Sequence, residues 1–276
     1  ALDSHRLAVE ARKAAWAGLK EDVDKTIRGY RGAVGLVIKD LDTGWQIDAN
    51  KDIAIPSASI VKIPIMMAVF SAAKDGKINL NDTIELKNSD KTDGSGVLKN
   101  ALAGPGYKVE DLISLMITQS DNTAANMLID RVGIDDLNSR FAKLGLKHTN
   151  LSRKMMDFRS RKSGVENYTT AGDMAYLLEG LYRGKFLGRD VSNRCLEFLA
   201  EQKINDRIPR RLPADTTVAH KTGLENGVCH DVGIVYTDKG NFLICVLVKH
   251  RSSTARVAKK LIAHLSLAAY SYYQGF

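Results

Sequence analysis

The sequence predicts an α/β (α+β) fold in which an antiparallel sheet, built from both ends of the chain and flanked by helices, is interrupted by an all-helical insertion. Strand-like segments occur near the start of the chain and again after about residue 215, whereas residues 57–187 are mostly helical segments and loops. Because a sheet and its helices must share a buried face, we expect an α/β domain from residues 1–48 and 195–276, an all-α domain from residues 49–194, and a functional site where they meet.

The first part of the chain combines one long helix with two strands. Apolar residues recur near helical spacing over residues 3–29, which predicts a helix that ends before Gly32. The apolar run AVGLVIKD at 33–40 predicts a strand, and the Asp-Thr-Gly turn that follows leads to a return strand at 45–49. These two strands supply the N-terminal share of the sheet.

The middle of the chain changes to helical periodicity. We expect helices over residues 109–118, 122–131 and 170–183. Residues 89–106 are rich in Ser, Asp and Gly, which predicts a loop. No internal repeat and no low-complexity linker is visible in the sequence.

The last part of the chain returns to strands. Residues 217–224 and 228–236 flank Glu-Asn-Gly, and Asn-Gly is a strong signal for a hairpin turn. A further turn leads to a strand at 241–249, and a final helix is expected over about 254–272. Strands from the two ends of the chain are therefore expected to form one antiparallel sheet.

The composition is that of an ordinary soluble globular protein. Of 276 residues, 44% are hydrophobic and 26% are charged, and the formal net charge is +8. A basic surface attracts polyanions, but the cations are scattered and no nucleic-acid-binding motif is present, so we expect no nucleic-acid partner. No run of eighteen apolar residues predicts a membrane segment.

The cysteines and histidines argue against two kinds of site. Cys195, Cys229 and Cys245 include no Cys-x-x-Cys pair, which excludes a disulfide framework and a zinc ribbon, although a single bridge is left open. We favour buried thiols that behave as small hydrophobic groups. The six histidines form no His-Glu-x-x-His pair, so we predict no metal and no cofactor.

One lysine stands in an unusually apolar stretch, PSASIVKIPIMM at 56–67. Lys62 either lies on apolar surface with its amine in water, or is buried beside a partner. Ser59 is three residues earlier and would share a helical face with it, so the two polar groups could meet. A desolvated lysine has a lowered pKa and can act as a neutral base, which would make the Ser59 hydroxyl a nucleophile.

Two further motifs decide between these interpretations. Ser120-Asp121-Asn122 lies between two helical segments and alone would also suit a helix cap. Lys221-Thr222-Gly223 lies on the first strand of the late hairpin. Single matches are weak, as the stray pair Ser71 and Lys74 shows, but the ordered set S-x-x-K, S-D-N and K-T-G is the signature of class A β-lactamases and penicillin-binding proteins.

The chain resembles this superfamily of active-site serine hydrolases over nearly its whole length. Further matches are LDTG at 41–44, IPSASIVKIP at 55–64 and SDNTAAN at 120–126. The resemblance implies a β-lactamase/transpeptidase-like sandwich, in which an antiparallel sheet carries helices from both termini and an all-helical domain is inserted. That fold agrees with the strands and helices inferred above from periodicity.

The resemblance also implies catalytic roles. Ser59 would be the nucleophile and Lys62 its base or proton relay. Ser120 would pass a proton to the leaving nitrogen, and Lys221 would hold the electrostatics of Ser120 and of a substrate carboxylate. The oxyanion hole would be the backbone N–H groups of Ser59 and Leu224.

Four residues would bind substrate by the same resemblance. Asn122 would bind the amide side chain of the substrate, and Thr222, next to Gly223, would hydrogen-bond its carboxylate. His230 aligns with a position that often carries a carboxylate-binding arginine. The alternative for His230 is a strand histidine that faces solvent.

The loop that carries the hydrolytic glutamate of class A β-lactamases departs from the family pattern. That glutamate, in R-x-E-x-x-L-N, activates the water that hydrolyses the acyl-enzyme. When Arg153 is aligned with the motif arginine and Thr169-Thr170 with the threonines that follow, Met155 stands in place of the glutamate, and no L-N follows. Asn126, which contacts this loop in the family, is kept.

A methionine cannot accept a proton from water, and the loss of a general base costs about 10²–10⁴-fold in rate. We therefore expect a penicillin-binding D-alanyl-D-alanine peptidase-like enzyme that β-lactams acylate at Ser59 and that deacylates slowly. Asp157 or Glu166 would replace the base only if the loop followed a different path; otherwise they form surface ion pairs. The alternatives are a β-lactamase with an atypical base and a non-catalytic β-lactam sensor.

The expected partners follow from this interpretation. They are β-lactams or a peptidoglycan stem peptide that ends in a carboxylate, which a cationic pocket would suit. The start of the sequence lacks a charged segment followed by an apolar one, so we expect a signal peptide to be absent or already removed. We expect a monomer in an extracytoplasmic location, periplasmic or secreted.

Overall fold

The structure, a computed structural model, is organised around a five-stranded antiparallel sheet. It describes the backbone of residues 2–275 and the side chains of residues 7 and 9–275. Every neighbouring pair of strands is antiparallel. The N-terminal part of the sheet lies beside its C-terminal part, with Leu36 opposite Val246, as the sequence predicted. In spatial order the strands are β2 (Gln46–Ala49), β1 (Ala33–Asp40), β9 (Phe242–Lys249), β8 (Val228–Val235) and β7 (Val218–Glu225).

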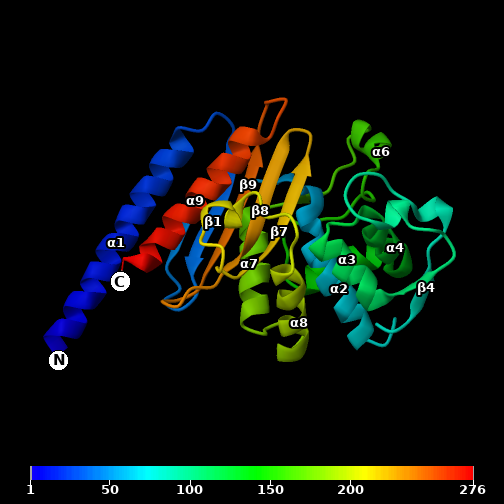
Figure 1. Cartoon of the computed structure of the whole chain (residues 1–276), viewed down its shortest axis with the longest axis horizontal. Coiled ribbons are helices and arrows are strands. Elements are labelled where there is room, and N and C mark those ends of the chain that lie inside the picture. The colour runs from blue at the N-terminus through cyan, green and yellow to red at the C-terminus, as the bar shows by residue number, and fades with distance from the viewer. Residues whose placement is uncertain (1, 276) are drawn as a thin grey trace.

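The two faces of the sheet are covered by different helices (Figure 1). α1 (Leu2–Arg28) and α9 (Arg256–Gln274) lie side by side on one face, and α7 (Ala171–Tyr182) packs on the other. Side chains alternate between the faces, so Ile38 joins the core under α1 and α9 while its neighbour Val37 joins the core of the helical side. Because both faces are buried, β1 is a continuous apolar run rather than an alternating one.

The helical insertion is built around α2 (Lys62–Lys74). Every residue from 60 to 70 is buried, which explains why this segment is apolar all round instead of along one stripe. The remaining helices are α3 (Val109–Thr118), α4 (Asn122–Val132), α5 (Ile134–Lys143), α6 (Phe158–Lys162) and α8 (Arg189–Ala200).

The three helices predicted in the insertion coincide with α3, α4 and α7 to within about one residue at either end. The expected domain boundary between residues 194 and 195 lies within α8, which packs against β7, and the division into two domains stays a prediction. Short elements were not foreseen, because two or three residues carry no readable periodicity. They are β3 (Ile55–Pro56) paired with β6 (Tyr168–Thr169), β4 (Thr83–Glu85) paired with β5 (Gly106–Lys108), and the 3₁₀ turns η1 (Ala58–Val61), η2 (Asn88–Asp90), η3 (Leu98–Asn100) and η4 (Ile208–Arg211).

The cysteines are free and buried, which confirms the interpretation as small hydrophobic groups over a bridge. Burial raises the pKa of the Cys245 thiol well above its usual value, because a thiolate would be poorly solvated there. Of the helices in residues 2–275, none is both long enough and apolar enough to cross a membrane.

Candidate active site

Lys62 is the first residue of α2 and is fully buried, so its amine does not reach water. It donates hydrogen bonds to the Ser120 carbonyl (2.7 Å), to Asn122 Oδ1 (2.7 Å) and to Ser120 Oγ (3.2 Å). Burial lowers the pKa of Lys62 to about 7, although the carboxylates of Asp121 and Glu225 act in the opposite direction. Near neutral pH a large part of Lys62 is therefore an uncharged amine, which keeps two N–H donors and has one lone pair that can accept a proton.

Ser59 lies in the 3₁₀ turn η1, directly before α2, and its side chain is partly exposed. The residue before it, Ala58, has a φ of 45°, a left-handed conformation that is costly for a residue with a Cβ. The structure differs from the sequence prediction in one respect: among the hydrogen bonds of the described residues, none joins Ser59 Oγ to Lys62 Nζ. The Lys62 amine points instead to the loop before α4 and contacts Ser120 and Asn122.

In the segment Ser120-Asp121-Asn122, one residue caps a helix and the other two contact Lys62. Asp121 caps α4 by accepting a hydrogen bond from Ala124 N, and its other oxygen accepts from the backbone N–H groups of Val97 and Leu98. The helix-cap role weighed for the motif therefore belongs to its middle residue. Its two neighbours, Ser120 and Asn122, are left to face Lys62.

Lys221 on β7 is the second buried amine at this point. Its Nζ donates to Ser120 Oγ (2.9 Å) and to the Thr222 carbonyl (2.9 Å). Burial, and then the charge of Lys62, lower the pKa of Lys221 well below its usual value. The hydroxyl of Ser120 thus lies within hydrogen-bond distance of both amines, which is the arrangement that a proton relay needs.

Strand β7 lies directly against the turn that carries Ser59. A Cβ at Gly223 would stand 3.2 Å from the Ser57 carbonyl and 3.2 Å from Ile60 Cγ2, so glycine permits this close approach. The next residue, Leu224, has a side chain that is 48% exposed. The backbone N–H groups of Ser59 and Leu224 are therefore on neighbouring segments, and their assignment as an oxyanion hole stays a prediction.

His230 does not occupy the place expected of a substrate-binding residue. It is fully buried on β8, so it does not face solvent either. Its Nε2 lies 2.8 Å from the Pro56 carbonyl, and its Nδ1 accepts a hydrogen bond from Val248 N. Burial lowers the pKa of His230 to about 4, so the ring is neutral and fastens β3 to the sheet instead of presenting a cation to a carboxylate.

Asn126 holds Met155 through the backbone. Met155 N donates to Asn126 Oδ1 (2.8 Å), and Asn126 Nδ2 donates to the Met155 carbonyl (3.1 Å). This reciprocal pair fixes the position of the loop residue that the alignment placed opposite the hydrolytic glutamate. The Met155 side chain is 6% exposed and belongs to the hydrophobic core of the helical side.

The two carboxylates considered as substitutes are engaged elsewhere. Asp157 caps α6 by accepting from Ser160 N and Ser160 Oγ, and these hydrogen bonds lower the pKa of the Asp157 carboxyl. Glu166 is 9% exposed and pairs with Arg153 (2.7 Å) and with Arg161 (3.0 Å). Both are held in structural contacts, as the alternative reading had it, although Glu166 is buried rather than on the surface.

Comparison with known proteins places this geometry in a family. Residues 18–273 match the profile of the β-lactamase enzyme family. The chain belongs to that family. Among curated relatives, β-lactamase VEB-1 of Pseudomonas aeruginosa is 25% identical over 268 residues, which cover 91% of this chain and 89% of the relative, and the extended-spectrum β-lactamase PER-1 of the same organism is 24% identical.

Solved structures of similar fold include both enzymes named β-lactamases and a protein named PBP-A. A β-lactamase from Sphaerobacter thermophilus is 33% identical, with a TM-score of 0.85, over 95% of this chain and 98% of the other. PBP-A is 28% identical, with a TM-score of 0.86, over 94% and 97%. This member of the β-lactamase enzyme family thus belongs to a superfamily of serine hydrolases in which both kinds of protein share the fold.

One site feature of this β-lactamase-family chain was not foreseen. Glu225, directly after Leu224, pairs with Arg153 and Arg161 of the loop that carries Met155. The charge signs in the sequence were visible, but only the fold shows that residues 72 positions apart meet. The described residues include no group of three or more His, Cys, Asp and Glu side chains suited to hold a metal ion.

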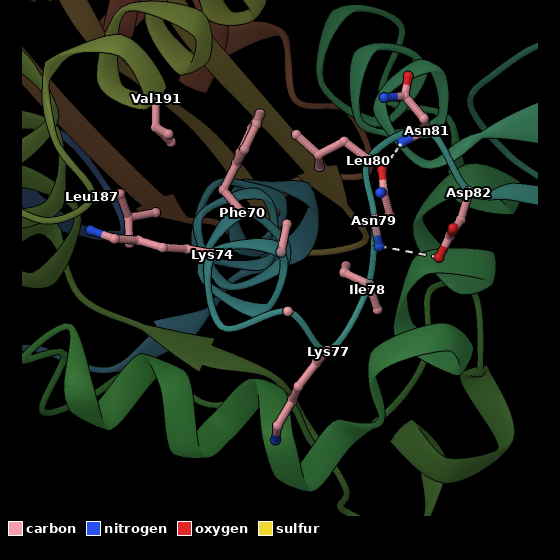
Figure 2. Close-up of a pocket in the computed structure, with 12 residues that line it drawn as sticks. Phe70, Lys74, Lys77, Ile78, Asn79, Leu80, Asn81, Asp82, Leu187 and Val191 are labelled. Atoms are coloured by element: carbon pink, nitrogen blue, oxygen red, sulfur yellow. Dashed lines mark hydrogen bonds between the residues drawn. The ribbon is translucent and has the colours of Figure 1, made fainter.

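A hollow of about 740 Å³ near the other end of α2 is not part of this site (Figure 2). It lies between the end of α2, residues 76–82 and the start of α8, with Phe70, Leu80 and Val191 in its wall. Phe70 follows Lys62 by eight residues, or about 12 Å along a helix. The residues that line it include none of the three motifs.

Proposed function

We propose that this protein is a penicillin-binding, D-alanyl-D-alanine peptidase-like serine hydrolase, which β-lactams acylate at Ser59 and which releases the acyl group slowly. The observation that carries this proposal is the loop: Asn126 holds the backbone of Met155 at the position aligned with the hydrolytic glutamate, and the nearby carboxylates of Asp157 and Glu166 are engaged in other contacts.

Acylation would use the groups that meet around Ser120. Ser59 Oγ attacks the amide carbonyl carbon, and its proton passes to the neutral amine of Lys62, whose lowered pKa suits a base at neutral pH. The carbon–nitrogen bond then breaks, and the leaving nitrogen takes a proton from Ser120 Oγ. Lys62, 3.2 Å from that oxygen, returns a proton to it, which restores the starting charges.

Substrate binding would use the part of the site around Lys221. Lys221 and the hydroxyl of Thr222, on the strand next to Ser59, suit a carboxylate at the end of a stem peptide or on a β-lactam. Asn122 Nδ2 donates to the Asp93 carbonyl and has a second hydrogen, which can bind the carbonyl of a substrate amide. The oxyanion would be held by the backbone N–H groups of Ser59 and Leu224, worth about 3 kcal/mol each.

Deacylation lacks an evident base. A water molecule that attacks the acyl ester must give up a proton, and a thioether accepts none, so the expected loss is about 10²–10⁴-fold. Acylation by a β-lactam is known in this fold, since a leucine-to-glutamate mutant of the similar PBP-A has a solved structure described as an acyl-enzyme complex with penicillin G. A peptidase acting on stem peptides would work outside the cytoplasm, and we propose that location here, with the chain acting as a monomer.

A β-lactamase with an atypical base is the second candidate, because the relatives VEB-1 and PER-1 and the Sphaerobacter protein all bear that name. A non-catalytic β-lactam sensor would also be acylated but would not turn over a D-Ala-D-Ala peptide.

Incubation with penicillin G followed by intact mass over time distinguishes the slowly deacylating peptidase from a β-lactamase. We expect an adduct that lasts for minutes or more, and a clearance rate of tens per second would refute the peptidase proposal.

A further inference from the structure

Four charged side chains join the loop that carries Met155 to the end of β7. Arg153 and Arg161 come from the loop together with Glu166, and Glu225 comes from the strand. Each arginine contacts both glutamates: Arg153 at 2.7 Å and 3.1 Å, and Arg161 at 3.0 Å and 3.2 Å. We call these four residues the loop–strand clasp.

The clasp is too buried to be an ordinary surface ion pair. The side chains of Arg153, Glu166 and Glu225 are 2%, 7% and 14% exposed, and that of Arg161 is 25% exposed. Exposed ion pairs are held weakly, but a buried charge that loses its partner is left without solvation, so such contacts persist in the folded state. With two cations and two anions the clasp is neutral as a whole. It fixes the loop against the strand without adding net charge.

The clasp also has a special position relative to the proposed chemistry. Glu225 directly follows Leu224, whose N–H is the expected oxyanion donor, and Arg153 stands two residues before Met155. A movement of the loop away from β7 would therefore change the position of the Leu224 N–H and of the Met155 segment at the same time. In addition, the Glu225 carboxylate is close enough to Lys62 to raise the pKa of its amine.

We propose that Glu225 is a positioning residue for acylation, which holds the Met155 loop against β7 and supplies a negative charge that acts on the Lys62 ammonium. This inference rests on the proposed acylation of Ser59 and adds a residue that the three motifs do not contain. The charged groups that act on Lys62 are Asp121, which caps α4, and Lys221 and Glu225 of β7; beyond Glu225 lie Arg153, Arg161 and Glu166.

Charge balance gives the proposal a signature that loosening alone cannot produce. Glu225→Gln breaks the clasp and leaves it with one excess positive charge, which disfavours the Lys62 ammonium and lowers its pKa. Arg161→Gln breaks the same clasp but leaves one excess negative charge, which raises that pKa. Two variants that loosen the same contact should therefore move the pH dependence of acylation in opposite directions.

The experiment measures the rate of acylation by penicillin G between pH 5 and pH 9 in the full chain. Below the pKa of its base the rate falls about tenfold per pH unit, so the midpoint of the acid limb reports that pKa. We expect the midpoint to lie at lower pH in Glu225→Gln and at higher pH in Arg161→Gln. Glu225→Asp, which keeps the charge, should retain the wild-type midpoint even if its plateau rate falls.

The matched control is Glu179→Gln. Glu179 of α7 likewise holds two cations, Lys39 at 2.6 Å and Arg183 at 3.0 Å, but neither belongs to the site, so the midpoint should stay in place. If wild type is acylated and the two clasp variants shift in the same direction, or neither shifts, the role of Glu225 is refuted while the proposed function stands. If Glu225→Gln does not fold, the upward shift in Arg161→Gln and the unchanged midpoint in Glu225→Asp still decide. If wild type is not acylated, the proposed function itself fails.

Discussion

Replacing Lys62 by methionine should change the stability of the protein in a way that depends strongly on pH. In the folded state burial lowers the pKa of Lys62 to about 7 from its ordinary value of 10.5. Between these two values the unfolded chain binds a proton that the folded protein does not, so the free energy of unfolding rises with pH across this window. The decrease in the free energy of unfolding that the buried amine causes is therefore fully present below pH 7 and disappears above pH 10.5.

The size of the effect follows from the two pKa values. At pH 7 the amine lowers the free energy of unfolding by about 4 kcal/mol, and at pH 10 by less than about 1 kcal/mol. Lys62→Met removes this term but leaves the Ser120 carbonyl and Asn122 Oδ1 without their donor, which costs about 1–3 kcal/mol for each group. The two effects are of similar size at pH 7, so the net change at a single pH is a poor test.

The pH dependence separates the two effects, because the lost hydrogen bonds do not titrate in this range. Urea unfolding of wild type and Lys62→Met at pH 7 and pH 10 gives the required four free energies. The free energy of unfolding of the variant minus that of wild type should be about 3 kcal/mol larger at pH 7 than at pH 10. Lys74→Met, which removes an exposed lysine from the other end of α2, is the matched control. If the variant and wild type differ by the same amount at both pH values, Lys62 is not a buried neutral amine, and the argument for it as a base collapses.

Three further predictions concern the chemistry. Peptide mapping after penicillin treatment should place the adduct on Ser59 alone and not on the stray motif residue Ser71; an adduct that persists in Ser59→Ala would contradict the assignment. Lys62→Arg should lose acylation, because arginine cannot give up its proton, and acylation at wild-type speed in this variant would remove the base role. Met155→Glu should shorten the life of the penicilloyl-enzyme, followed by intact mass, if the new carboxylate reaches the ester; a tenfold gain requires only about 1.4 kcal/mol.

Much of the fold could be predicted because its signals are local. The continuous apolar run of β1 predicts a strand and the apolar spacing of α3 predicts a helix, each from ten residues or fewer, and both elements were placed correctly. The Asn-Gly turn predicted the β7–β8 hairpin in the same way. The order of the three motifs then named Ser59, Lys62 and Lys221, and the structure brings the last two together around Ser120.

The contacts of these residues could not be predicted with the same ease, because they are set by tertiary packing. Helical spacing suggested Ser59 as the partner of Lys62, whereas its hydrogen bonds go to residues about sixty positions away in the chain. His230 was expected to reach a substrate or solvent, but it lies on β8, between β7 and β9, where every residue of the strand is buried. The pairing of Arg153 with Glu225 depends on the same long-range assembly.

The pairing of β1 with β9 has a consequence for the order in which the molecule assembles. Leu36 and Val246 are opposite each other, so the middle of the sheet joins segments that are about 200 residues apart in the chain. A ribosome would have to release nearly the whole polypeptide before β1 found its central neighbour and before α9 covered the outer face. Contacts between α3 and α4 are local and do not have to wait, since closing a short loop costs less entropy than closing a long one. We therefore expect the helical insertion to gain structure first, and chains cut short before β9 to expose an unpaired strand edge and aggregate.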